Sequence, residues 1–326
     1  MPAKIYVTRA LPEAALAILR VCGDLHVWEK DEIIPREILL REVHNSEALL
    51  CMVTERIDED LLVHGPQLKI VANMAVGYDN VEVPALTRRG IVFTNTPGVL
   101  TETTADLAFA LILGIARRIG EGERIVRSGH WRAWSPFAFL GHDVHHATLG
   151  IIGLGRIGME VAKRAKGFDM RVLYTNRNRS QKAEERFGCL RVDLTTLLRE
   201  SDFIVVLVPL TTETRHLLST PQFKLMKRSA SLINAARGPI VDQKALYIAL
   251  RDGLIAGAAL DVTDPEPIPM TDPLLSLENC LIVPHVGSAS VATRTRMATL
   301  AAENIAAFLN GQRPPTPVNP EVLGKK

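Results

Sequence analysis

The chain has 326 residues, of which 47% are hydrophobic and 23% are charged, and its formal net charge is +2. This composition is typical of a folded globular protein and excludes disorder, a collagen-like repeat and a coiled coil. At about 100 to 200 residues per domain, the length favours two domains. No basic run indicates binding to nucleic acid or to an anionic membrane. The sequence therefore predicts small molecules and further copies of the chain as partners.

The apolar runs and the cysteine pattern bear on the cellular compartment. The longest apolar stretch, residues 107–116, is about half as long as a bilayer crossing requires. Residues 4–8 read as a strand soon after Met1, so no signal peptide is expected. We therefore expect a cytoplasmic protein. Four cysteines stand alone, without a CxxC pair that would suggest a zinc site or a disulfide framework: Cys22, Cys51, Cys189 and Cys280.

Short β-branched runs alternate with helical patterns through residues 1–98, which is typical of a parallel α/β sheet. A helical pattern covers residues 12–20. The strand candidates are residues 5–8, 48–53, 68–72 and 91–94. Residues 101–104 then offer an N-cap for a long apolar helix that runs to Arg118 and suits a bridge between domains. An ordinary core helix of one domain would show the same apolar periodicity. We place the domain boundary near residue 99.

A second series of strand candidates begins at Thr148, with helical patterns between most of its members. The candidates are residues 149–152, 171–175, 203–208, 231–234, 256–260 and 281–283. Six strands in this order predict a complete dinucleotide-binding fold. A last helical pattern, residues 291–309, is expected to pack back onto the first domain. The predicted fold class is therefore α/β, with two doubly wound parallel-sheet domains.

A glycine-rich turn follows the first strand of this second series. Gly153, Gly155 and Gly158 form a GxGxxG motif between an apolar strand and the helical pattern at residues 159–166. In this context the glycines permit a tight turn, a close approach of the backbone to a pyrophosphate, and close packing of helix on strand. The motif predicts a dinucleotide site. The remaining residues of its predicted cradle are Leu154, Arg156 and Ile157.

The next strand leads into Asn176, at a position where an NAD-specific site normally carries Asp or Glu for the ribose hydroxyls. Arg177, Asn178 and Arg179 follow it. The loop has no carboxylate to repel a 2′-phosphate and two guanidinium groups that can bind one. It therefore favours NADP(H), with NAD(H) possible. Solvated loop arginines are the alternative interpretation, but they do not explain the missing acid.

Residues that directly follow the predicted strands are expected to face a shared cleft, because ligands of open parallel sheets bind beyond the carboxyl ends of the strands. One arginine, one carboxylate pair and one histidine stand at these places. The strand-end residues that we assign to the cleft are Val208, Pro209, Ala235, Ala236, Arg237, Asp261, Glu266, His285 and Gly287.

Three of these side chains are the ones that reduction of a 2-oxo acid needs. Arg237 supplies a planar fork for a substrate carboxylate, and His285 can deliver a proton near neutral pH. Glu266 would orient the imidazole. A nicotinamide would deliver hydride to the carbonyl carbon while the cation and the proton donor neutralise the charge on its oxygen. Each residue alone also fits a structural role, and their convergence beside a nucleotide fold favours catalysis.

The sequence resembles the D-isomer-specific 2-hydroxyacid dehydrogenases, and among them the glyoxylate and hydroxypyruvate reductases. The resemblance covers nearly the whole chain. Its motifs are residues 75–80, 94–101, 150–158, 236–238, 260–262 and 284–289. It implies reduction of glyoxylate or hydroxypyruvate to glycolate or D-glycerate, for which the loop after Asn176 favours NADPH. In that reaction His285 looks like the proton donor, Glu266 its partner, and Arg237 the ligand of the substrate carboxylate.

The resemblance also implies roles for other residues. Val76 and Gly77 match a loop whose amides bind the substrate carboxylate. Thr104 matches a residue near the cofactor phosphates, and Asp261 a position beside the nicotinamide amide. The strand end at residues 234–236 departs from the pattern, because relatives often carry a Ser or Thr there.

The implied architecture is a split substrate domain, residues 1–98 plus 288–326, that flanks an NAD(P)-binding domain, residues 99–287. A homodimer built from the cofactor domains is expected. Met52, Val76 and Trp134 are the candidates for the wall of the substrate pocket, with Trp134 reaching the site of the neighbouring subunit. Simple packing of Trp134 in a dimer interface is an equal alternative.

Other functions stay open at this stage. A metal site at the cluster His142, His145 and His146 lacks a further ligand nearby. A formate dehydrogenase needs no proton donor, so Glu266 and His285 argue against it. A D-3-phosphoglycerate dehydrogenase or another D-2-hydroxyacid dehydrogenase is an alternative enzyme. A nucleotide-sensing protein, like the transcriptional corepressors that resemble these enzymes, is the alternative from another class, and cofactor binding without turnover would support it.

Overall fold

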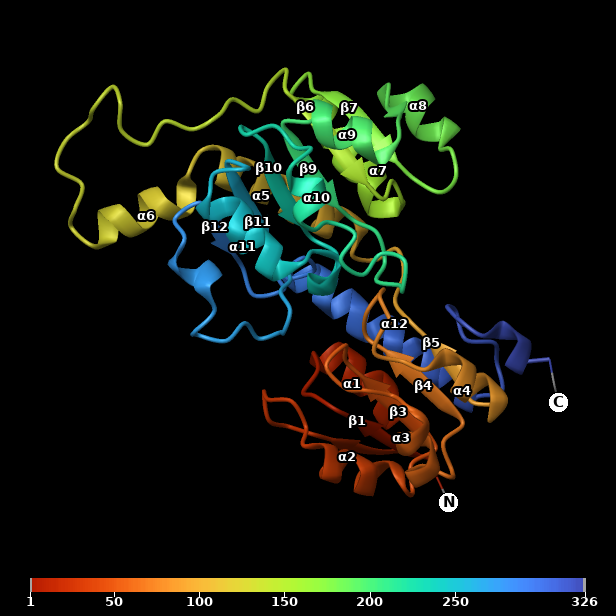
Figure 1. Ribbon diagram of the computed structural model, residues 1–326. Helices are drawn as coiled ribbons and strands as arrows, with labels where there is room; N and C mark the ends of the chain where they lie inside the picture. Colours follow the sequence, from red (N-terminus) through yellow and green to blue (C-terminus); the bar gives the residue numbers. More distant parts are fainter. Residues whose placement is uncertain (1, 325–326) are drawn as a thin grey trace. The chain divides into compact units, whose positions relative to one another are not determined.

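The computed structural model describes residues 2–324. The chain divides into two compact units. Unit 1 combines the chain up to Leu100 with the chain from Ala289 onward, and unit 2 is Thr101–Ser288. Each unit contains one parallel sheet with helices packed on it (Figure 1). The predicted α/β fold class, with two doubly wound parallel sheets, is confirmed.

Unit 1 is built on a five-stranded sheet in the order β2-β1-β3-β4-β5, which is the flavodoxin-like order. Its strands are β1 (Lys4–Val7), β2 (Asp24–Val27), β3 (Ala48–Cys51), β4 (Ile70–Asn73) and β5 (Val92–Thr94). Its helices are α1 (Glu13–Arg20), α2 (Arg36–Val43), α3 (Glu59–His64), α4 (Val83–Arg88) and α12 (Val291–Leu309), with a 3-10 turn at Pro320–Val322. The central strands β3 and β4 are buried along their whole length, which explains why they are apolar except for Asn73 at the end of β4.

Helix α12 returns the chain to the sheet of unit 1. Ser290 caps its first turn by accepting a hydrogen bond from the backbone N–H of Thr293 at 3.2 Å. Its Ala298 and Ala301 belong to the same buried cluster as Ile5 of β1. Small side chains on this face allow the helix to approach the sheet closely.

Unit 2 is built on a seven-stranded sheet in the order β12-β11-β10-β9-β6-β7-β8. Its strands are β6 (Thr148–Ile152), β7 (Arg171–Thr175), β8 (Leu190–Arg191), β9 (Phe203–Val206), β10 (Ser231–Asn234), β11 (Gly257–Leu260) and β12 (Cys280–Ile282). Its helices are α5 (Thr101–Ala116), α6 (Ile119–Arg127), α7 (Arg156–Lys166), α8 (Gln181–Phe187), α9 (Leu194–Glu200), α10 (Thr220–Phe223) and α11 (Gln243–Arg251), with 3-10 turns at Gly238–Ile240 and Pro273–Ser276. The winding reverses between β6 and β9, which is where ligands of such sheets bind.

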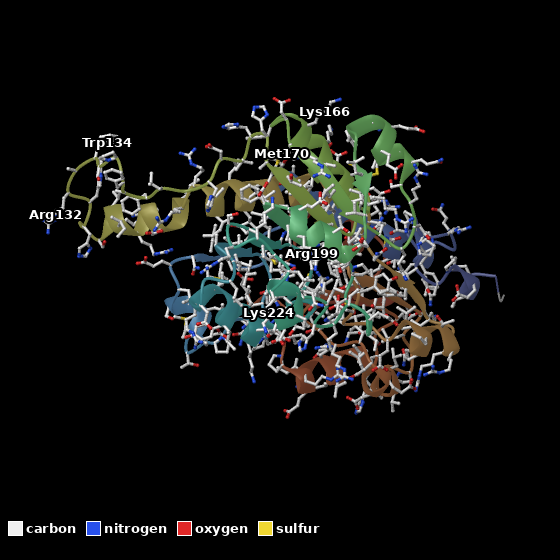
Figure 2. The ribbon with its side chains drawn as sticks, turned by 45° about the horizontal axis from the view of Figure 1, so that its top comes forward. Arg132, Trp134, Lys166, Met170, Arg199 and Lys224 are labelled. Carbon is white, nitrogen blue, oxygen red and sulfur yellow. The ribbon has the colours of Figure 1, made fainter. Side chains whose placement is uncertain are left out.

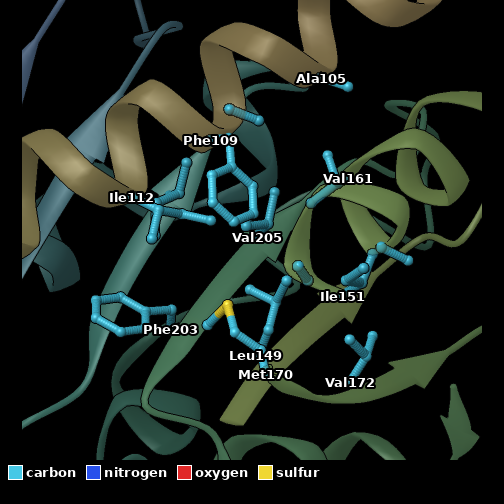
Figure 3. Close-up of a cluster of buried hydrophobic side chains, with 14 of the residues drawn as sticks. Ala105, Phe109, Ile112, Leu149, Ile151, Val161, Met170, Val172, Phe203 and Val205 are labelled. Atoms are coloured by element: carbon cyan, nitrogen blue, oxygen red, sulfur yellow. The ribbon is translucent and has the colours of Figure 1, made fainter. Parts of the chain in front are cut away.

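One face of this sheet is covered by α5 and α7. Figure 3 shows Phe109 and Ile112 of α5 directed at the strands that carry Leu149, Phe203 and Val205. Eight of the sixteen residues of α5 are buried, so the long apolar helix is a core element of unit 2. Burial of aliphatic and aromatic side chains of this size contributes about 1.5 to 3 kcal/mol each, which makes this face a main source of the stability of the unit.

Helix α6 and the segment after it, residues 119–140, extend away from the sheet of unit 2; we call this segment the arm (Figures 1 and 2). No residue of α6 is buried. Figure 2 places Arg132 and Trp134 at the far end of the arm. Its exposed large apolar side chains are Ile119, Val126, Trp131, Trp134, Phe137, Phe139 and Leu140. A group of exposed apolar side chains on one segment is typical of a surface that contacts a partner.

Within residues 2–324, none of the helices has the length and apolar character that crossing a membrane requires.

Candidate active site

The glycine turn follows β6 at the reversal point of the unit 2 sheet. Gly153 adopts φ +100°, and a Cβ there would come within 2.7 Å of the backbone nitrogen of Val208, which follows β9. A Cβ on Gly158 would come within 2.7 Å of the Gly153 carbonyl oxygen. Both glycines are therefore required by packing of the turn against its own surroundings.

Gly155 differs from these two glycines, because a Cβ there would meet nothing within 4 Å. It is the N-cap residue of α7, so the first-turn N–H groups of Arg156 and Ile157 lie at a helix N-terminus that carries no acidic residue. Open space, backbone donors and the positive end of the helix dipole suit a pyrophosphate group. The turn thus fits a dinucleotide on its geometry as well as on its sequence.

The loop after β7 is held in place by hydrogen bonds that sequence reasoning did not anticipate. Asn176 accepts a hydrogen bond from the Leu154 N–H at 3.0 Å and donates one to the Leu154 carbonyl at 3.2 Å. Its side chain is therefore used to tie the loop to the glycine turn. Arg191 donates to the carbonyl oxygens of Asn176 and Arg177, both at 3.1 Å, and so braces the same loop.

The two arginines of this loop are not equivalent. Arg179 is bound by Glu184, with its Nε 2.8 Å and its Nη2 2.7 Å from one carboxylate oxygen. Glu184 also accepts a hydrogen bond from the Tyr174 hydroxyl at 2.6 Å. Arg177 and Asn178 are both exposed. Because Arg179 is committed to Glu184, Arg177 is the cation of this loop that is better able to bind a phosphate.

The strand ends after β9 and β10 supply the next group of predicted residues. Val208 and Pro209 follow β9, and Ala235 and Ala236 follow β10; all four lie at the carboxyl edge of the sheet. The Arg237 guanidinium donates to the Ala236 carbonyl at 2.7 Å.

Gly238 brings the arginine segment against the segment that carries the glutamate. A Cβ on Gly238 would come within 1.9 Å of the Thr263 carbonyl oxygen, a distance that only glycine allows. The Thr263 N–H in turn donates to Glu266 Oε1 at 3.1 Å. The close approach therefore places Arg237 in the electrostatic environment of Glu266.

Glu266 and His285 form a direct hydrogen-bonded pair, with Oε2 and Nδ1 2.8 Å apart. Their side chains are 37% and 36% exposed. Burial alone would raise the pKa of Glu266, but the hydrogen bond and charge of His285, the Thr263 amide and the Arg237 charge together lower this pKa below its ordinary value of 4.5. Glu266 is therefore ionised at neutral pH and holds Nδ1, which leaves Nε2 for a substrate.

Asp261 holds the backbone of the histidine segment. Its two carboxylate oxygens accept hydrogen bonds from the N–H groups of Val286, at 2.6 Å, and Gly287, at 3.0 Å. His285 itself adopts φ +52°, a left-handed conformation that costs a residue with a side chain about 1 to 2 kcal/mol. Desolvation raises the pKa of the buried Asp261. A Cβ on Gly287 would approach the Thr104 side chain at 3.3 Å, so Thr104 of α5 lies beside this segment.

The predicted substrate residues of unit 1 lie at the carboxyl edge of its sheet. Met52 directly follows β3, and Val76 and Gly77 lie in the loop after β4. The carbonyl of Ala75 accepts from the Thr96 N–H at 2.8 Å, and that of Val76 from Asn95 Nδ2 at 2.9 Å.

A trans peptide points its C=O and N–H in opposite directions. Because the protein binds the carbonyls of Ala75 and Val76, the N–H groups of Val76 and Gly77 are turned the other way. Within the described residues neither N–H donates to a protein acceptor. Two adjacent amides in this state suit a carboxylate.

The structure thus brings together Arg237, Glu266, His285, Asp261 and Thr104 in unit 2. Trp134 lies at the far end of the arm and is 81% exposed. Across the part of the chain that the structure describes, no group of three or more His, Cys, Asp or Glu side chains is placed to hold a metal ion.

Comparisons with known proteins agree with this geometry. Residues 109–287 match the family model described as D-isomer specific 2-hydroxyacid dehydrogenase, NAD binding domain. The sequence is 51% identical to a glyoxylate reductase from Pyrococcus horikoshii, over 99% of this chain and 98% of that protein.

Solved structures are similar over the whole chain as well. A protein from Thermus thermophilus has a TM-score of 0.91 and 46% identity, covering 97% of this chain and 99% of that one. An NADPH-dependent glyoxylate/hydroxypyruvate reductase from Sinorhizobium meliloti, in complex with NADP and malonate, has a TM-score of 0.83 and 32% identity, covering 98% of this chain and 97% of that one.

Proposed function

Because this chain belongs to the D-isomer-specific 2-hydroxyacid dehydrogenase family of NAD(P)-dependent oxidoreductases, we propose that it reduces glyoxylate and hydroxypyruvate to glycolate and D-glycerate. The observation that carries this proposal is the Glu266–His285 pair beside Arg237. The name of the relative from Pyrococcus horikoshii supports the choice of glyoxylate, and that of the Sinorhizobium meliloti structure supports hydroxypyruvate as well.

In the proposed reaction each residue has one task. When bound, the reduced nicotinamide supplies the hydride for the carbonyl carbon of the substrate. Arg237 and the amides of Val76 and Gly77 bind the substrate carboxylate. His285 donates its Nε2 proton to the carbonyl oxygen, and Glu266 keeps the ring oriented and stabilises its protonated form.

The cofactor of the family is a nicotinamide dinucleotide, and within this class we propose a preference for NADPH. Two features support this preference. Residue 176 is Asn and not Asp or Glu, and the guanidinium of Arg177 is exposed. Arg179 contributes less to the proposed phosphate site because Glu184 binds it.

We propose a homodimer in which the arm of one subunit contacts the unit 2 of its partner. The exposed apolar side chains of the arm support this assembly, and so does the position of Trp134 at its end. In such a dimer Trp134 would reach the substrate site of the neighbouring subunit, with Met52 and Val76 as the remaining pocket wall.

The test is the absorbance of the reduced nicotinamide on mixing the protein with NADPH or NADH and glyoxylate, hydroxypyruvate or pyruvate. Fast oxidation of NADPH with the first two acids, and slower oxidation with pyruvate, is the expected result. Tight NADPH binding without turnover of any acid would refute the reductase and favour a nucleotide sensor.

A further inference from the structure

Two loops of unit 1 carry predicted substrate residues. Side chains outside the proposed catalytic and binding residues connect these two loops. Met52 follows β3, and the loop of residues 75–80 follows β4. The two strands are paired neighbours, with Cys51 opposite Asn73. Their carboxyl ends therefore place both loops side by side at one edge of the sheet.

The Met52 residue is held on both sides by side chains. Its N–H donates to Glu55 Oε2 at 2.7 Å, and its carbonyl accepts from Asn80 Nδ2 at 3.1 Å. The same Asn80 nitrogen donates to the Glu55 carbonyl at 2.8 Å. One amide from the second loop thus fixes two carbonyls of the first.

Glu55 is the buried anchor of this arrangement. Its carboxylate is fully buried and accepts from the Thr8 hydroxyl at 2.6 Å and the Thr54 hydroxyl at 2.5 Å, in addition to the Met52 N–H. The nearest Arg9 nitrogen is 3.9 Å away. A buried carboxylate with this many donors is rigidly placed, because each donor offsets part of the cost of burying its charge.

The second loop is connected to the same network. Asn73 Nδ2 donates to the Gly77 carbonyl at 3.1 Å and lies 3.5 Å from Asn80 Oδ1. Together with the bonds to the Ala75 and Val76 carbonyls, these contacts bind the carbonyls of three consecutive residues of the loop. The outward amides of Val76 and Gly77 are therefore presented at a fixed place relative to Met52.

We propose that Asn80, anchored through Glu55, is a positioning residue that sets the distance between the Val76–Gly77 amides and the Met52 wall, and thereby the affinity for the substrate carboxylate. This inference rests on the proposed function of those amides. Asn80 acts through hydrogen bonds to backbone groups and does not itself touch the substrate.

The test compares Asn80→Ala with Asn319→Ala. Asn319 is a buried asparagine of the same unit that also makes three hydrogen bonds, to the Phe93 N–H, the Thr87 hydroxyl and the Ile91 carbonyl, but none to the two loops. We expect Asn80→Ala to raise the KM for glyoxylate about tenfold or more, with kcat and the Kd for NADPH nearly unchanged. Asn319→Ala should leave that KM within about twofold of the wild type, whatever it does to Tm.

Two further measurements keep the proposal open to refutation. If Asn80→Ala does not fold, Asn80→Asp keeps the size and the Oδ1 acceptor but cannot donate, and it should raise KM in the same way. An unchanged KM in a folded Asn80 variant, or an equal rise in Asn319→Ala, overturns the proposal.

Failure of the proposed function has a separate signature, because the wild type would then turn over neither glyoxylate nor hydroxypyruvate. In that case hydrogen exchange decides the positioning role. In the wild type the Met52 amide donates to Glu55 Oε2, and the Ile57 amide donates to the Asn80 carbonyl. Asn80→Ala should speed the hydrogen exchange of both amides, and Asn319→Ala should not. Equal exchange in the two variants overturns the proposal.

Discussion

His285 is held by two carboxylates that do different things. Glu266 binds the ring at Nδ1, and Asp261 binds the N–H groups of the two residues that follow the histidine. The left-handed backbone of His285 is maintained because these contacts outweigh its cost. Ring orientation and backbone position are thus controlled separately.

Replacing His285 tests the proposed proton donor. We expect His285→Ala to lower kcat about 100-fold or more, because general acid catalysis is lost, with the Kd for NADPH nearly unchanged. The measurements are steady-state turnover and a cofactor titration. His145→Ala, in which an exposed histidine of the same unit is removed, is the control. Loss of NADPH binding in His285→Ala would instead mean that this histidine is structural.

The lowered pKa of Glu266 predicts a pH profile. Because the pKa of Glu266 lies below the ordinary glutamate pKa of 4.5, this residue loses its charge only at a pH below 4.5. The pH profile of kcat/KM should therefore show no acid limb from Glu266 between pH 5 and 7. For the same reason its contribution to stability is present above pH 4.5 and lost as the pH falls through the lowered pKa. Profiles of the wild type and Glu266→Gln between pH 4 and 8 check this. An acid limb near pH 6 that Glu266→Gln abolishes would contradict the assignment.

Replacing Arg177 tests cofactor choice. Arg177→Ala should weaken NADPH binding about 10- to 100-fold, because a charged hydrogen bond to the 2′-phosphate is lost, and it should leave NADH nearly unaffected. Arg179→Ala is the matched control, and we expect a smaller effect because Glu184 already binds Arg179. Titrations of both cofactors measure the four values. Equal losses for NADPH and NADH would remove Arg177 from the phosphate site.

At the scale of elements, the segments of the candidate active site are placed by close backbone contacts between strand ends. Gly238, after β10, allows the chain to touch the Thr263 carbonyl after β11. Gly153, after β6, likewise lies against the backbone after β9. Neighbouring parallel strands thus bring their carboxyl ends into one layer, and glycine allows the loops between them to touch.

Gly238→Ala should disturb the glutamate loop. The new Cβ would overlap the Thr263 carbonyl oxygen, so we expect a loss of about 1 to 3 kcal/mol in the free energy of unfolding and a lower kcat as Glu266 moves. Denaturant unfolding and turnover measure the two effects. Gly122→Ala, whose Cβ would meet nothing within 4 Å, is the control. Wild-type stability and kcat in Gly238→Ala would show that the loop yields without consequence.

At the scale of the whole molecule, the exposed aromatic side chains of the arm are not explained by the packing of a single chain. Its Trp134 and Phe137 are 81% and 85% exposed, which is costly for aromatic side chains of this size. Aromatic residues are enriched at protein interfaces, where they supply much of the binding energy.

We therefore expect a dimer in solution that the double substitution Trp134→Ser, Phe137→Ser converts toward monomer. Sedimentation velocity across a range of concentrations measures the change. Met270→Ser, which removes an 88% exposed apolar side chain outside the arm, should leave the dimer intact. A monomeric wild type, or a double variant that stays dimeric, would exclude the arm as the interface.

The family and the fold class could be predicted from the sequence because both depend on local patterns, which can be read without knowing the tertiary structure. The buried strands β3 and β9 are continuous apolar runs, and the glycine motif lies between a strand and a helix. The strands β2 and β8 were missed. β2 alternates polar and apolar residues at a sheet edge, and β8 has only two residues, both exposed. The family prediction is confirmed by the relatives of similar length.

The sequence alone identified the strand-end Arg237, Glu266 and His285 and the glycine turn as candidates, because each follows a predicted strand. Only the tertiary structure decided how those residues are used. In the folded chain Asn176 is hydrogen-bonded to Leu154 and Arg179 to Glu184. The buried carboxylate of Glu55 accepts a hydrogen bond from the Met52 N–H. Such contacts join segments that are separate in the chain, and no local pattern records which partner a side chain will meet.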